Sequence, residues 1–232
     1  MLKKVVFLDF YGTVVHEDSK AIPFIVECIC RDSKLELTAT DVYQYWAKRF
    51  AGLFSESYGI KFELQRDILL TSLKDTIAYF QSKGDPFDLS KPLFEHWTKP
   101  PIFEDSKQFM EVVDLPVCIV SNIDRADLLM AMEYHNLKFD YIITSEDARS
   151  YKPRPEMFQM ALRELSVLPE DVIHVGDSLI SDVFGAKKLG ITAAWINRKQ
   201  REQNNRIHPD LISRNLIDLL DSDFIVKKKE HN

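Results

Sequence analysis

The chain has 232 residues, of which 45% are hydrophobic and 28% are charged, which excludes a disordered chain and suits an α/β domain with a smaller second domain. The formal net charge of −6 argues against nucleic acid as an electrostatic partner. The "KKKE" run near the C-terminus is interpreted as a solvated tail.

Cysteine usage and the first residues predict the compartment. The three cysteines, Cys28, Cys30 and Cys118, form neither a disulfide framework nor a zinc-ligand set, so we interpret them as small core residues in a reducing compartment. Asp9 interrupts the opening apolar run too early for a signal peptide, and no stretch has the length of a membrane span. A cytoplasmic protein without a membrane partner is predicted.

Five short apolar runs predict the strands of a sheet. Unbroken runs of this kind suit strands that are buried on both faces, as in a parallel sheet. The runs cover residues 5–8, 117–120, 141–144, 172–175 and 193–196. Amphipathic helices are predicted between the later runs, over residues 124–135, 155–165 and 181–189. This alternation predicts an α/β fold with a doubly wound, mainly parallel, Rossmann-like sheet.

The stretch from residue 17 to residue 97 contains only helical patterns, such as "TDVYQYWAKRFAGLF". About 80 residues are too many for an ordinary crossover between strands. We therefore expect an inserted all-helical cap domain at 17–97 and a catalytic core formed by 1–16 and 98–232. The "GDPFDLSKP" stretch and the "KPP" at 99–101 are expected to form bends and the return hinge.

Polar residues follow the predicted strands at the edge where parallel strands end together. They are Asp9, then Ser121 and Asn122, then Lys152, and finally Asp177 with Asp182 five residues later. Each alone has a structural explanation; Asp9, for example, could cap a helix. Because ligands bind at this edge of a doubly wound sheet, their joint occurrence predicts a site for one small anionic substrate.

Four segments carry a family resemblance: "FLDFYGT", "CIVSN", "YKPRPEMF" and "VGDSLISD". In this order they resemble the four motifs of the haloacid dehalogenase superfamily of hydrolases, in its version with a helical cap after the first strand. The resemblance runs from residue 5 to about residue 197 and covers nearly all of the core. The expected cap resembles the family only in size and helicity.

The resemblance implies that Asp9 is a nucleophile, which forms an aspartyl ester that water then hydrolyses. It implies that Lys152 offsets negative charge shared by Asp9 and the substrate. Ser121 and nearby backbone N–H groups would hold substrate oxygens, and the substrate-binding set also includes Tyr11, Thr13 and Asn122.

The resemblance also implies a Mg²⁺ site. Asp9, Asp177 and the backbone carbonyl of Tyr11 would supply the hard oxygen ligands that this ion prefers. Asp182 would be another ligand or would support the ligands from outside.

Tyr11 departs from the phosphatases of this superfamily, most of which carry a second aspartate there. That aspartate gives general acid–base help of roughly 10²–10⁴-fold. A tyrosine, with a pKa near about 10, is a poor replacement, and the alternative interpretation is that Tyr11 only packs under the cap.

Asp-x-Tyr-Gly-Thr is instead similar to the first motif of the 2-haloacid dehalogenases, which use no metal. Asp177 argues against a dehalogenase, because without a cation it would repel a carboxylate substrate beside Asp9. The sequence has no clear match to their cap arginine, for which Arg49 in "YWAKRF" is named as a candidate. Phosphonate-cleaving relatives use a cap lysine, for which Lys48, Lys61 and Lys74 are available.

The sequence therefore predicts a Mg²⁺-dependent hydrolase of small phosphorylated metabolites. The alternative is a metal-independent 2-haloacid dehalogenase with the same nucleophile. Minor alternatives are a phosphonate hydrolase and a non-catalytic binding protein. The sequence leaves the substrate and the oligomeric state open.

Overall fold

A computed structural model describes residues 2–17, 20–203 and 206–226. Its centre is a six-stranded sheet with the order β3-β2-β1-β4-β5-β6, in which every neighbouring pair is parallel. The strands are β1 (Val5–Leu8), β2 (Val117–Ser121), β3 (Tyr141–Thr144), β4 (Val172–Gly176), β5 (Thr192–Ile196) and β6 (Leu211–Ser213). The predicted doubly wound, Rossmann-like sheet is confirmed, with all five predicted strands. The short strand β6 was not predicted, because its three residues form no apolar run.

The strands are apolar because the sheet is buried on both faces. In β1, Val6 and Leu8 belong to one buried cluster, whereas Val5 and Phe7 belong to a second cluster on the opposite face. Successive side chains of a strand point to opposite faces, so a strand covered on both sides needs apolar residues at every position. This burial explains why the strands could be predicted as unbroken runs.

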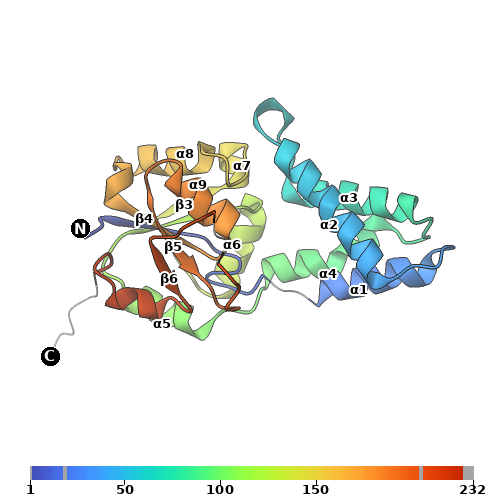
Figure 1. The fold of residues 1–232 in the computed structure, drawn as a ribbon, viewed down its shortest axis with the longest axis horizontal. Coiled ribbons are helices and arrows are strands. Elements are labelled where there is room, and N and C mark those ends of the chain that lie inside the picture. The colour runs from blue at the N-terminus through green and yellow to red at the C-terminus, as the bar shows by residue number, and fades with distance from the viewer. Residues whose placement is uncertain (1, 18–19, 204–205, 227–232) are drawn as a thin grey trace.

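Helices cover both faces of the sheet (Figure 1). They are α5 (Glu104–Val112), α6 (Arg125–Tyr134), α7 (Ser145–Ala148), α8 (Glu156–Glu164) and α9 (Gly185–Lys187), and the same part of the chain has 3-10 turns at Pro169–Asp171 and Ile217–Asp221. A further 3-10 turn, Gly59–Lys61, lies between α2 and α3. The helices predicted at 124–135 and 155–165 correspond to α6 and α8. The helix predicted at 181–189 is instead a π-helical turn, Leu179–Phe184, followed by the single turn of α9.

The first four helices after β1 form a separate lobe beside the sheet (Figure 1). They are α1 (Ala21–Asp32), α2 (Ala39–Glu56), α3 (Gln65–Tyr79) and α4 (Pro86–Thr98). We call residues 21–98 the helical lobe. Helices α2 and α3 match the helical patterns of the sequence. Within the lobe, the indole N–H of Trp46 donates to Ser72 Oγ at 3.0 Å and joins α2 to α3.

Only Gly84 and Asp85 of the "GDPFDLSKP" stretch lie in the connection between α3 and α4; the rest of the stretch opens helix α4. The Asp85 side chain accepts a hydrogen bond from the Asp88 N–H at 2.9 Å, and Pro86 occupies the first turn, where its missing N–H is not needed. Pro92 lies inside the helix and removes one backbone hydrogen bond. Burial of apolar side chains after it, such as Trp97, offsets that loss.

Other sequence expectations concern the surface and the cysteines. Among the residues that the structure describes, no helix is long and apolar enough to cross a membrane. The three cysteines are free thiols, of which Cys28 and Cys118 are buried and Cys30 is half-buried. The predicted "KKKE" tail lies outside the described residues.

Candidate active site

Asp9 lies directly after β1, at the carboxyl edge of the sheet, and only 6% of it is exposed. Its Oδ1 accepts hydrogen bonds from Lys152 Nζ at 2.8 Å and from Ser121 Oγ at 3.1 Å. Its Oδ2 accepts one from Thr13 Oγ1 at 3.0 Å. Three segments that are distant in sequence therefore hold one carboxylate in a fixed orientation, as a nucleophile requires.

Lys152 is the cation of this cluster. Its ammonium also donates to Asp182 Oδ1 at 2.6 Å and to the Val120 carbonyl at 2.7 Å, so all three protons are used. Burial alone would lower the pKa of Lys152, but the charges of Asp182 and Asp9 raise it above its ordinary value. Lys152 is therefore a charged and fully oriented group.

Asn122 contacts the backbone of Lys152. Its Oδ1 accepts from the Lys152 N–H at 2.7 Å, and its Nδ2 donates to the Lys152 carbonyl at 3.2 Å. Through these two bonds Asn122 positions the lysine. Its predicted contact with substrate stays a prediction.

Asp182 is held by the protein on both oxygens. Oδ1 contacts Lys152 and, at 3.0 Å, His174 Nε2, while Oδ2 accepts the Ser178 N–H at 2.9 Å. The π-helical turn brings the carboxyl group against Gly176, where a Cβ would lie 2.2 Å from the Asp182 carboxyl carbon. The Lys152 charge and the His174 hydrogen bond hold the pKa of Asp182 well below its ordinary value, although burial acts to raise it.

His174 was not among the predicted site residues. It lies in the middle of β4 and is fully buried. Burial lowers its pKa despite the raising effect of Asp182, so the ring is neutral and its Nε2–H donates to the carboxylate. A single polar residue in the buried run "VIHV" was the signal that could have identified it.

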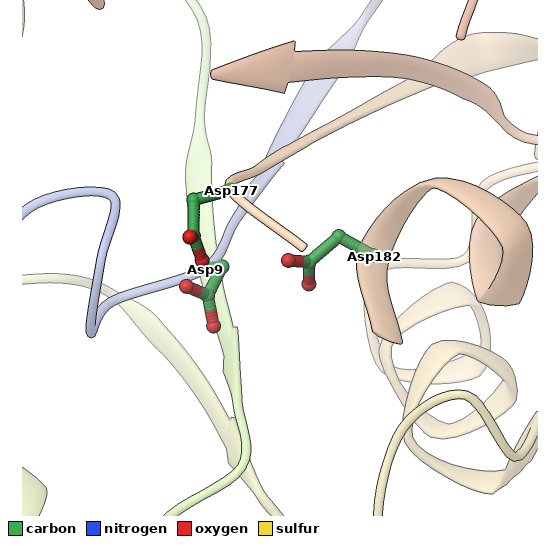
Figure 2. Close-up of side chains that lie close together, drawn as sticks. All are labelled: Asp9, Asp177 and Asp182. Carbon is green, nitrogen blue, oxygen red and sulfur yellow. The ribbon is translucent and has the colours of Figure 1, made fainter. Parts of the chain in front are cut away.

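Asp177 follows β4 and lies on the other side of Asp9. Figure 2 shows the two carboxyl groups close together, with that of Asp182 reaching towards them from the helical side. Asp177 packs against Gly12, whose φ of +88° favours glycine and where a Cβ would lie 2.6 Å from Asp177 Oδ1. Burial, together with the charges of Asp182 and Asp9, raises the pKa of Asp177 to about 8.

The donor set fits a divalent cation. One oxygen each of Asp9, Asp177 and Asp182 lies within 4.8 Å of the others, and oxygens of this kind are ligands that Mg²⁺ prefers. The raised pKa of Asp177 comes first from burial and then from the charges of Asp182 and Asp9, and Arg201 acts against it. Asp182 Oδ1 accepts hydrogen bonds from both Lys152 and His174, so Asp182 could also support the ligands from outside, as the alternative expectation had it. The expected contribution of the Tyr11 carbonyl stays a prediction.

Tyr11 points its hydroxyl group at the helical lobe. The hydroxyl donates to the carbonyl of Trp97, in the last turn of α4, at 2.5 Å. Burial raises the pKa of Tyr11 well above its ordinary value, and the nearby charges of Asp127 and Asp9 add to this effect. The phenol is therefore neutral, and its proton is engaged by the backbone.

The core contacts the lobe through a second acidic pair that sequence reasoning missed. Asp124 accepts the N–H groups of Gln65 and Arg66 at 2.7 and 3.0 Å and so caps the start of α3. The Arg66 guanidinium donates to both oxygens of Asp127, at 2.8 and 2.5 Å. Burial raises the pKa of Asp124 to about 6. These contacts fix the lobe on the loop after β2 and on the first turn of α6.

The candidate lobe cations named from the sequence have other surroundings. Arg49 pairs with Asp75 at 2.7 Å, within the lobe. Lys48, Lys61 and Lys74 are exposed. Arg66, rather than Arg49, is the lobe arginine that contacts the core.

A model of the haloacid dehalogenase-like hydrolase family matches residues 3–190. The chain belongs to this family. The resemblance carried by the four motifs is thereby confirmed, and the residues gathered around Asp9 lie at those motifs.

Curated relatives include a haloacid dehalogenase-like hydrolase domain-containing protein 3 of Danio rerio, which is 32% identical over 60% of this chain and 55% of its own length. A phosphoserine phosphatase of Thermus thermophilus is 28% identical over 53% and 52%. A pyrophosphatase of Bacillus cereus is 29% identical over 64% and 74%. The chain spans about half the length of the first two of these relatives.

Solved structures with the same fold include both kinds of enzyme. The L-2-haloacid dehalogenase from Xanthobacter autotrophicus superposes with a TM-score of 0.71 at 19% identity, over 94% of this chain and 97% of its own. A phosphatase of this superfamily from Thermococcus onnurineus gives a TM-score of 0.63 at 24% identity, over 94% and 96%. At these identities the likeness concerns the fold alone.

Proposed function

We propose that the chain is a Mg²⁺-dependent phosphatase of small phosphorylated metabolites that acts through an aspartyl-phosphate on Asp9. The observation that carries the proposal is the acidic cluster of Asp9, Asp177 and Asp182, in which one oxygen of each residue lies within 4.8 Å of the others. The phosphatases among the relatives support the same substrate class.

The geometry assigns a role to each oxygen of Asp9. Oδ1 receives both Lys152 and Ser121, whereas Oδ2 receives only Thr13 and keeps an electron pair for attack. In the first step a bond forms between Oδ2 and phosphorus, and the bond from phosphorus to the leaving oxygen breaks. In the second step water hydrolyses the acyl phosphate, which releases phosphate and restores the carboxylate.

Asp9 and Asp177 would hold Mg²⁺, which when bound would offset the negative charge that the phosphoryl group brings to these carboxylates. Lys152 keeps the Asp9 carboxylate oriented, and Asp182 and His174 keep Lys152 in place. The hydrogen bonds among these residues are made before substrate arrives, so little reorganisation is needed at the moment of reaction.

Tyr11 limits the substrates. Its hydroxyl proton is engaged by Trp97, so it gives the leaving group no proton, and we infer a preference for aryl or acyl phosphates over alkyl phosphates. The change Tyr11→Asp is then expected to raise turnover of alkyl phosphates by up to roughly 10²–10⁴-fold, with little gain on p-nitrophenyl phosphate. Phosphate release from both substrates measures this. A wild type that prefers alkyl phosphates, with a variant that only loses activity, would contradict it; circular dichroism checks that the variant is folded.

We further propose that the helical lobe is a cap, with cap residues 17–97 and core residues 1–16 and 98–232. The contacts of Arg66 and Tyr11 support this, because they bring the lobe over the edge of the sheet where Asp9 lies. A cap of this kind would exclude water and contact the variable part of the substrate.

One observation favours a second candidate, a metal-independent 2-haloacid dehalogenase. Arg201 pairs with Asp177 at 3.0 Å and supplies a cation that reduces repulsion of a carboxylate substrate. In that reaction Asp9 would displace halide, which leaves as an anion without a proton, and water would hydrolyse the ester. Tyr11 suits this chemistry as well.

A paired screen tests both candidates. Release of phosphate from phosphate esters and of halide from 2-chloropropionate is measured for the same protein with Mg²⁺ and with EDTA. The phosphatase proposal expects phosphate release that EDTA removes and Mg²⁺ restores. Halide release at full rate in EDTA would support the dehalogenase and contradict the phosphatase proposal. Asp9→Asn serves as the inactive control in each arm.

A further inference from the structure

The cation Arg201 stands against the carboxyl group of Asp177. Its Nη2 lies 3.0 Å from Asp177 Oδ2, and the same nitrogen donates to the backbone carbonyl of Asp177. The Arg201 side chain is 47% exposed, compared with 18% for that of Asp177. A half-exposed cation thus contacts the most exposed of the three acids of the site.

The backbone of Arg201 is fixed by Asn197, which follows β5. The Asn197 side chain accepts from the Arg201 N–H and donates to the Arg201 carbonyl, both at 2.8 Å. The N–H of Asn197 in turn donates to the Ser213 carbonyl of β6 at 2.7 Å. Because these bonds anchor the backbone to the sheet, the guanidinium is delivered to Asp177 while its side chain stays able to move.

Arg198, three residues earlier, shows what a permanent contact looks like here. Its guanidinium meets both oxygens of Asp105 at 2.9 Å, donates to the Thr13 carbonyl at 2.7 Å and packs on the Phe103 ring. Arg201 instead contacts the Asp177 carboxyl group through one nitrogen. Both arginines line a cavity of about 210 Å³. An exposed contact through one nitrogen is more easily exchanged than a buried bidentate pair.

We propose that Arg201 is a resident counter-ion of Asp177 that competes with a divalent cation for the same carboxyl group. Two cations that share one carboxylate repel each other, so a metal at Asp177 displaces the guanidinium into the adjoining cavity. This inference rests on the metal site of the proposed function. On this inference, Arg201 supplies the positive charge beside Asp177 whenever the metal is not bound.

Isothermal titration of metal-free protein with Mg²⁺ tests the competition without any measurement of turnover. Arg201→Gln is expected to bind Mg²⁺ about tenfold more tightly than wild type. Lys187→Gln is the matched control, because it also removes one half-exposed cation from an ion pair, that with Asp210, and should leave the affinity unchanged. Arg201→Lys, which retains the charge, is expected to stay close to wild type.

The titrations are run at about pH 9, above the pKa of about 8 given for Asp177. Residual protonation would weaken binding in Arg201→Gln, so it could not produce the expected gain. Equal or weaker binding by Arg201→Gln, with Mg²⁺ bound by wild type, overturns the inference and leaves the metal assignment standing. Absence of Mg²⁺ binding in wild type and in every variant overturns both the inference about Arg201 and the metal assignment. Thermal melts in EDTA check that each variant is folded.

Discussion

The two sides of Asp9 differ in how their charges are compensated. On the paired side, Lys152 lies between Asp9 and Asp182, and His174 completes the hydrogen bonds of Asp182; all of them are buried. On the open side, Asp177 has a pKa of about 8 and is contacted by the half-exposed Arg201. Two aspartates that follow β4, Asp182 in the π-helical turn and Asp177 directly after the strand, thus have pKa values shifted in opposite directions.

This difference separates two tasks. A buried carboxylate costs free energy unless it is paired and hydrogen-bonded, so the paired side is suited to hold a fixed geometry. An acid left short of positive charge is suited to take up a cation or a charged substrate. The paired side therefore positions the nucleophile, and the open side is where ligands exchange.

The largest expected effect comes from Asp9, which both sides share. Asp9→Asn should lower turnover by about 10⁴-fold or more while the protein remains folded, since the amide has nearly the same shape but does not attack. Steady-state rates measure the loss. Asp140→Asn, an exposed change just before β3 at the opposite edge of the sheet, is the control and should retain activity. Near-wild-type turnover by Asp9→Asn would contradict every enzymatic assignment made for this site.

Removal of the cation should break the paired side. Lys152→Met leaves Asp9 and Asp182 buried without their partner, and we expect the free energy of unfolding to fall by about 3–5 kcal/mol. Urea denaturation measures this. Adding Asp182→Asn to the variant removes one unpaired charge and should recover part of the loss. A loss below about 1 kcal/mol would mean that the pair does not hold the site together.

Asp177→Asn and Asp182→Asn should change the stability of the metal-free protein in opposite directions. Because the pKa of Asp177 is raised to about 8, metal-free wild type loses stability as the pH rises from about 4 to about 8. Asp177→Asn removes that loss, so above pH 8 it should be more stable in EDTA, by about 1–2 kcal/mol or about 2–8 °C in melting temperature.

Asp182→Asn should be less stable than wild type at neutral pH, because a carboxyl group with a lowered pKa stabilises the fold above its ordinary pKa. Thermal melts in EDTA across this pH range check both signs. Destabilisation by both changes would remove the contrast between the two sides. Added Mg²⁺ should raise the melting temperature of wild type but not that of Asp177→Asn.

The smallest effect is expected at His174. Its pKa is lowered by burial, so wild type should lose stability as the pH falls below about 6.5, where the unfolded chain binds a proton that the folded ring resists. His174→Gln keeps an N–H donor for Asp182 and should cost about 1 kcal/mol or less near neutral pH. Urea denaturation at about pH 7 and pH 5.5 should give a flatter dependence for this variant than for wild type. An equal pH dependence of stability in the variant and in wild type would show that the His174 ring does not have to stay neutral.

Much of this arrangement could be predicted from local patterns. The unbroken apolar runs identified five strands because a strand covered on both faces must be apolar at every position. The positions of Asp9, Lys152 and Asp177 just after or shortly beyond such runs placed them at one edge of the sheet, because parallel strands end together. Helix α4 was missed because proline is read as a breaker, although a buried apolar face can compensate for it.

Only the tertiary structure decided which residues far apart in the chain contact one another. The sequence named Asp182 as a further metal ligand or an outer support, and only the structure shows that its Oδ1 is bonded to both Lys152 and His174. It left the role of Tyr11 open, and the hydroxyl turns out to bond to Trp97, 86 residues later. The physical reason is that residue spacing determines periodicity and the side on which a group emerges, whereas charge compensation depends on which distant segments pack against that group.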